Sequence, residues 1–222
     1  MFNWATTCMH SSTTTFAAGC ASGFIEVSLT HPLDVLKMNM QRGSTPNWQR
    51  CYAGVATRWT SVLPMRGILW SAKRHGSNMS GNILGKSTVL GSACGAAQSI
   101  IDVPMENIKF QKQLMQGGNS VSYAPGNLCR GVVPNVLRNM VLCSCILGGA
   151  LSEASLGLPI GAAFGCILSQ PLDYVKSMHQ SNMADAINMR HCMRGWLPRA
   201  MMTPVNICVS YGVFHFIESN MS

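Results

Sequence analysis

Residues 31–41 read HPLDVLKMNMQ, and two later stretches repeat their pattern. Residues 102–113 read DVPMENIKFQKQ, and residues 170–180 read QPLDYVKSMHQ. Each copy places an acid two positions after a proline, a lysine five positions after it and a glutamine nine positions after it. The acid is the most informative member, because three of the only eight aspartates and glutamates in the chain occupy this position. Such internal repetition is typical of a fold built from similar units.

A second pattern, a small residue followed three positions later by a proline, lies between these copies. Its three occurrences are Ser61 with Pro64, Gly131 with Pro134, and Gly195 with Pro198. The two patterns alternate at near-constant spacing, and each interval is long enough for one helix with its connection. We therefore predict a single domain over residues 1–222, made of three repeats of two helices at residues 12–83, 84–155 and 156–222.

The composition points to a membrane or to a large buried interface. The chain is 47% apolar and only 11% charged, whereas soluble domains carry roughly 25% charged residues. No window offers a clean run of about 20 apolar residues. The expected helices instead mix glycine, alanine, serine and cysteine with a few charges, which suits spans that pack closely around a polar interior. The predicted fold is an all-α membrane protein with six transmembrane helices and short segments between them.

The repeated motifs resemble those of the mitochondrial carrier family, the six-helix antiporters of the mitochondrial inner membrane. The family motif is proline-x-acid-x-x-base at the end of each odd helix, followed by aromatic-base-glycine at the start of each even helix. The resemblance runs from about Gly19 to Glu218, and the second motif is only partly kept. It implies a multi-pass inner-membrane protein that takes part in transport, with membrane lipid, above all cardiolipin, as a partner.

The remaining composition excludes several other classes of protein. The net charge is +8, but aromatic residues are too scattered for a nucleic-acid surface. The ten cysteines include no Cys-x-x-Cys pair, and six fall inside apolar helices, which favours small buried side chains over a metal site. There is no nucleophile–base–acid set and no nucleotide-binding loop. We therefore expect no enzyme, no catalytic residue, no metal and no cofactor.

The basic residues of the connections indicate which side faces the matrix. They gather after the odd helices and before the even ones, and the positive-inside rule assigns that side to the matrix. They are Arg42, Arg50, Arg58, Lys112, Arg130, Arg190 and Arg194.

Two expected helices carry features that need an explanation. The first, over about residues 13–41, contains Gly19 and Gly23 at a spacing that lets backbones approach closely. The second, over residues 62–80, is interrupted by the charged residues 73–75. Either this helix ends near His75 and its long side chains reach the membrane surface, or a partner protein covers it.

The repeated charges predict a ring at the matrix end of the helices. Within each copy the acid and the lysine lie three positions apart, hence on one helix face. Prolines that bend three helices toward a common axis would let the acid of one helix meet the lysine of the next; alternatively, each pair is satisfied locally. The ring comprises Asp34, Lys37, Glu106, Lys109, Asp173 and Lys176, the kinks Pro32, Pro104 and Pro171, and the bracing glutamines Gln41, Gln113 and Gln180.

The starts of two even helices are candidate lipid sites. Unpaired backbone N–H groups and a basic side chain attract anions there, and the resemblance implies cardiolipin; simple extension of the side chain to the surface is the alternative. The residues are Arg130, Gly131, Arg194 and Gly195.

The resemblance also implies substrate contacts seven and eight positions after the glycine of each even helix. They are Ile68, Leu69, Arg138, Asn139, Met202 and Thr203. An arginine followed by an amide is similar to the carriers of carboxylates and keto acids, because a guanidinium binds a carboxylate bidentately. Glu26 is a further candidate, and as a buried acid it needs a partner, for which Arg138 is available.

Two functions remain open. The family's second gate, an acid and a base near the end of each even helix, is absent at residues 80–84, 150–154 and 214–218. Losing one of two gates disturbs the balance that keeps both closed states accessible. This favours an accessory or structural subunit of a larger inner-membrane assembly, for example a respiratory complex, with little or no transport. The alternative is an active antiporter of small carboxylates or keto acids.

Overall fold

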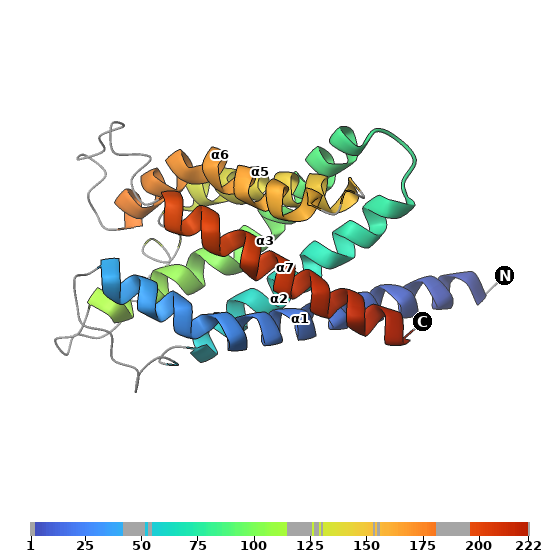
Figure 1. Cartoon of the computed structure of the whole chain (residues 1–222), viewed down its shortest axis with the longest axis horizontal. Coiled ribbons are helices and arrows are strands. Elements are labelled where there is room, and N and C mark those ends of the chain that lie inside the picture. The colour runs from blue at the N-terminus through green and yellow to red at the C-terminus, as the bar shows by residue number, and fades with distance from the viewer. Residues whose placement is uncertain are drawn as a thin grey trace. The chain divides into compact units, whose positions relative to one another are not determined.

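The computed structural model describes the backbone of residues 3–41, 52, 55–114, 126, 129, 131–152, 154, 156–180 and 196–221. Its side chains are described at residues 13–32, 52, 55–108, 126, 129, 131–152, 154, 156–176, 178–179 and 199–220. The secondary structure in this part of the chain is helical (Figure 1). The helices are α1 (Asn3–Gln41), α2 (Val55–Asn78), α3 (Ile83–Leu114), α5 (Val132–Leu151), α6 (Gly157–Gln180) and α7 (Trp196–Met221). The prediction of an all-α fold with six long helices is confirmed.

The prolines of the repeated acid–lysine motif lie inside helices. Pro32 lies within α1, Pro104 within α3 and Pro171 within α6, and each helix continues beyond its proline. Proline has no backbone N–H, so the carbonyl four residues earlier loses its helical donor. For Pro32 that carbonyl belongs to Ser28, and the hydroxyl of Tyr52 donates to it at 3.1 Å. A side chain from the segment before α2 therefore compensates the proline of α1.

Two helix boundaries differ from the prediction. The first helix begins at Asn3, ten positions before the predicted start at about residue 13. The second begins at Val55, seven positions before the predicted start at residue 62, and ends at Asn78, close to the predicted end at residue 80. It continues through the charged residues 73–75, so the alternative in which it ends near His75 is wrong. The charges are tolerated because two of them have partners nearby: Arg74 pairs with Glu218 at 2.8 Å, and the Lys73 amine lies 5.5 Å from the Tyr211 ring centre.

The chain divides into two compact units. The first contains Met1–His75 and Val205–Ser222, and the second contains Gly76–Pro204. In the first unit, Trp70 and Phe214 are fully buried and their rings stack with centroids 5.6 Å apart. The Trp70 indole donates to Ser210 at 3.0 Å, and Ser210 lies 3.1 Å from the Ser22 hydroxyl. A small hydrogen-bonded core thus joins α1, α2 and α7.

Glycines set the helix spacing in the second unit, in which α3 packs on α5 and α5 packs on α6. A Cβ added at Gly95 of α3 would collide with the backbone of Asn139 on α5. One added at Gly161 of α6 would collide with the carbonyl of Cys145. Backbones that approach this closely need glycine, as expected for packed membrane helices.

The outward face of α6 is apolar. Ile160, Phe164 and Leu168 follow at four-residue spacing, and between about half and two thirds of each side chain is exposed. Two helices of the described part, over Val132–Leu151 and Arg199–Asn220, are long and apolar enough to cross a membrane by length and composition.

Candidate functional site

Arg138 of α5 lies at the centre of a cluster of charges in the second unit. Its guanidinium donates to Asp102 of α3 and to Asp173 of α6, both at 2.9 Å. A third carboxylate, that of Glu106, lies 3.9 Å away. The same guanidinium also donates to the amide oxygen of Asn139 at 2.7 and 3.0 Å. Arg138 is thus held by acids from two other helices.

Helical spacing explains why these groups meet. Asp102 and Glu106 lie four positions apart on α3 and so share one face. Arg138 lies three positions after Asn135 on α5, which gives that helix a polar face toward α3. The close approach of the two backbones at Gly95 then brings short carboxylates and amides into contact.

Two further bases complete the cluster. Lys176 of α6 is buried and pairs with Glu106. Arg199 of α7 pairs with Asp173 at 2.9 Å and also donates to Gln170 at 3.2 Å. Three acids therefore face three bases among the described side chains of this unit, and the cluster is neutral without a ligand. We call these six residues the charge cluster: Asp102, Glu106, Arg138, Asp173, Lys176 and Arg199.

Uncharged side chains of α5 surround Asp102. Asn139 donates to its carboxylate at 3.4 Å and to Ser99 at 2.9 Å. Asn135 also donates to Asp102, at 3.4 Å, and is 0% exposed. The amide oxygen of Asn135 is buried and meets no hydrogen-bond donor among the described residues. A buried acceptor without a donor is costly, so this atom needs an explanation.

The partner of Glu26 is not the predicted one. Glu26 of α1 is 3% exposed and forms a bidentate pair with Arg66 of α2, with both contacts at 2.5 Å. The expected pairing with Arg138 is wrong, because Arg138 is surrounded by other acids. The sequence offers Arg66 as one of several bases on the neighbouring helix of the same repeat, together with Arg58, Lys73 and Arg74. The other two repeats show the same arrangement, in which an acid on the odd helix pairs with a base on the even helix. The pairs are Asp102 with Arg138 and Asp173 with Arg199.

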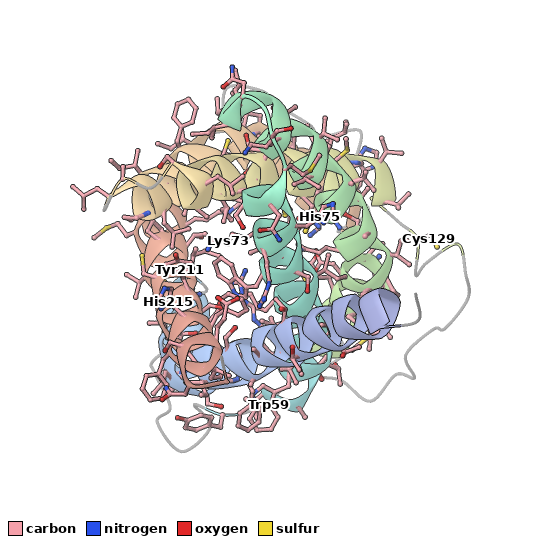
Figure 2. All side chains as sticks on the ribbon, turned by 90° about the vertical axis from the view of Figure 1, so that its right-hand side faces the viewer. Trp59, Lys73, His75, Cys129, Tyr211 and His215 are labelled. Atoms are coloured by element: carbon pink, nitrogen blue, oxygen red, sulfur yellow. The ribbon has the colours of Figure 1, made fainter. Side chains whose placement is uncertain are left out.

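A second polar group lies in the first unit. Arg74 donates to Thr15 of α1 and to Glu218 of α7, at 3.0 and 2.8 Å. In the same unit, Tyr211 lies between Lys73 and His215 (Figure 2). The ring centres of Tyr211 and His215 are 6.1 Å apart. Arg74 and Glu218 thus form an ion pair between α2 and α7 within the first unit.

The predicted matrix ring is described only in part. The structure brings together Glu106 and Lys176, and it places Asp173 against Arg138 and Arg199 instead of a lysine. The other members lie outside the described side chains: Asp34, Lys37, Lys109, Gln41, Gln113 and Gln180.

The predicted substrate contacts are described in both units. Leu69 is buried and Ile68 half-buried in the first, and Met202 and Thr203 are half-buried in the second. Of the predicted lipid residues, Gly131 precedes α5 with a φ of 74°, a conformation that favours glycine. Arg130, Arg194 and Gly195 lie outside the described residues.

The charged groups do not form a metal site. In the part of the chain that the structure describes, no group of three or more histidines, cysteines or acids could hold a metal ion. The acids of the charge cluster are instead occupied by nitrogen cations. Such an arrangement can exchange one cation for another, or release Arg138 to an incoming anion.

Comparison with known proteins finds one matching family model and several partial relatives. Residues 9–76 match the family described as "Mitochondrial carrier protein". The mitochondrial basic amino acids transporter of mouse is 31% identical over 129 residues, which cover 49% of this chain and 42% of that protein. The human protein of the same name is 30% identical over the same length. This chain thus covers less than half of the length of these relatives. Residues 9–76 are thus similar to mitochondrial carriers, and the repeated motifs and the long helices of the described part agree with that similarity.

Proposed function

We propose that this chain is a carrier of basic amino acids. The observation that carries the proposal is the placement of Arg138, whose guanidinium lies within 4 Å of three carboxylates. A basic amino acid brings two cationic groups and one carboxylate. Its side-chain guanidinium or ammonium can take the place of Arg138 on the acids, while its carboxylate binds the released Arg138 bidentately. The relatives named as basic amino acid transporters support the same substrate class.

The geometry argues against a small dicarboxylate as substrate. Arg138 is the charged member of the predicted substrate contacts on even helices, and acids already neutralise it. A dicarboxylate would have to displace those acids and would leave them buried without a counter-ion, which is strongly unfavourable. Arg66 is likewise neutralised, because its guanidinium donates to both carboxylate oxygens of Glu26.

Reconstituted exchange tests this proposal. Purified protein in liposomes loaded with L-arginine should take up labelled L-arginine and L-lysine, and should ignore 2-oxoglutarate, malate, citrate and ADP. Arg138→Ala should abolish the exchange, because the substrate carboxylate loses its partner. Lys86→Ala is the matched control in the same unit, since Lys86 only donates to a turn carbonyl at Met79. Exchange of 2-oxoglutarate but not of arginine would overturn the assignment.

The second candidate is an accessory subunit of a larger inner-membrane assembly. The missing acid–base pairs at the ends of the even helices favour it. The ion pair of Arg74 and Glu218 does not replace them, because both side chains are partly exposed. Such an ion pair contributes only about 0–1 kcal/mol to stability. Mild-detergent extraction followed by native electrophoresis separates the candidates. A carrier of 24.0 kDa migrates alone, whereas a subunit migrates with its complex.

A further inference from the structure

We infer that Asn135 and Asp102 form a subsite for the side-chain cation of the substrate, one helical turn from the predicted substrate contacts Arg138 and Asn139. The inference rests on the proposed function and adds the residues that would distinguish a cationic side chain from a neutral one. Asn135 is no member of a repeated motif, and it lies four positions after Gly131, not seven or eight.

The first observation is the unpaired oxygen of Asn135. The side chain is 0% exposed, and its Oδ1 meets no donor among the described residues. The orientation of the amide is fixed by its other end, because the nitrogen donates to Asp102 at 3.4 Å. The reverse orientation would place the amide oxygen against a carboxylate, which is repulsive. The atom without a described partner is therefore the amide oxygen of Asn135, which can accept a hydrogen bond from a ligand.

The second observation concerns Asp102 itself. Three side chains of α5 donate to its Oδ2, and no described donor reaches its Oδ1. A neutral amide oxygen and a carboxylate oxygen are thus both available, on two groups that one hydrogen bond joins. Water could satisfy the amide oxygen, but a carboxylate neighbour favours a donor with positive charge.

The chemistry of these two acceptors defines the ligand class. It must carry at least two N–H donors and a positive charge, as a guanidinium or a primary ammonium does. The guanidinium of Arg138 already sits on the other oxygen of Asp102, so the site accepts this group in the absence of substrate. The side chain of arginine or lysine fits this description, and its α-carboxylate could then reach Arg138.

Two ligands of the same shape test the subsite. L-citrulline carries a urea where L-arginine carries a guanidinium, so the pair differs mainly in charge. The measured quantity is the ratio of the two affinities, from thermal stabilisation of the purified full-length protein in detergent. Asn135→Leu should lower the arginine-over-citrulline ratio about tenfold, because a charged donor loses an acceptor. Asn135→Asp should raise the ratio by a similar factor, because it places a second carboxylate at the subsite.

The control is Gln98→Leu. Gln98 is a buried amide of α3 that contacts the thiols of Cys94 and Cys143 at 3.3 and 3.4 Å. This change should leave the ratio unaltered.

The outcomes separate the two levels of the argument. A wild type that binds neither ligand sinks the proposed function and the subsite together. If the wild type prefers arginine and both Asn135 variants keep the same arginine-over-citrulline ratio, only the subsite is overturned. The amide oxygen of Asn135 would then bind a water molecule. Opposite shifts of the ratio in the two variants support the subsite, because a purely structural role would move both in the same direction or neither.

Discussion

The pairing of Glu26 with Arg66 is more deeply buried than the pairing of Arg74 with Glu218 in the same unit. Both side chains are largely removed from water, and both guanidinium contacts measure 2.5 Å. A buried charge that loses its partner is strongly unfavourable, whereas replacing both charges by apolar groups is often neutral. Glu26→Gln should therefore lower the free energy of unfolding by about 3–5 kcal/mol. The thermal midpoint of unfolding in detergent measures the loss.

The matched variant removes both charges at once. Glu26→Leu with Arg66→Met should recover most of the stability that either single change loses. Equal losses for the single and the double variants would show that the ion pair itself stabilises the first unit, and would contradict a loss that comes from leaving one buried charge alone.

The hydroxyl of Tyr52 has a role only because of a proline. It donates to the Ser28 carbonyl, which Pro32 leaves without a helical donor. Tyr52→Phe should cost about 0.5–1.5 kcal/mol. In a Pro32→Ala background, a restored backbone N–H competes for the same carbonyl, so the cost should shrink. A double-mutant cycle on thermal unfolding checks this coupling; strictly additive costs would contradict the compensation.

At the scale of a helix, glycine decides how closely α3 approaches α5. A methyl group at Gly95 would collide with the backbone of Asn139, whereas one at Gly85 would meet nothing within 4 Å. Gly95→Ala should destabilise the protein by about 1–3 kcal/mol through overpacking. Gly85→Ala, in the first turn of the same helix, should be neutral or stabilising by up to about 1 kcal/mol. Thermal unfolding of the two variants side by side measures the difference; a similar loss in both would contradict the close approach.

The repeated proline motif predicted the helices well because it occurs three times. Three copies of an acid and a lysine at fixed spacing constrain the fold more than hydropathy does, since only two described helices pass a hydropathy test for a membrane span. Helix ends were harder: α2 continues past residues 73–75 because Glu218 and Tyr211, far along the chain, provide partners for two of its charges.

The site was predicted less completely than the fold. Arg138 and Asn139 follow from motif spacing, and the structure places both beside carboxylates. Asp102, Asn135 and Arg199 carry no repeated charge: Thr30 and Ser169 stand at the positions equivalent to Asp102, and Met65 stands at the position that Asn135 and Arg199 share. Their importance depends on which helix faces which, and single-sequence patterns do not contain that information.

At the scale of the whole molecule, the balance of charges predicts how the proposed transport of basic amino acids would respond to voltage. The charge cluster is neutral among its described members, so it contributes no compensating charge when a substrate of net charge +1 crosses. A potential of 100 mV acts on one charge with about 2.3 kcal/mol, or roughly fiftyfold at equilibrium. Net uptake of arginine into vesicles that are negative inside should approach that accumulation, and arginine–arginine exchange should be indifferent to voltage. If arginine accumulation does not depend on the membrane potential, a second charge must move together with arginine and cancel its charge.

The fluorescence of the two tryptophans of α2, Trp59 and Trp70, can report on the first unit. Trp70 is fully enclosed and bonded to a serine, whereas Trp59 stacks on Phe24 at a partly open position, with ring centroids 4.8 Å apart. In variants that keep only one indole, emission from Trp59 should fall with lipids brominated on their acyl chains. Emission from Trp70 should respond only when the helices around it separate.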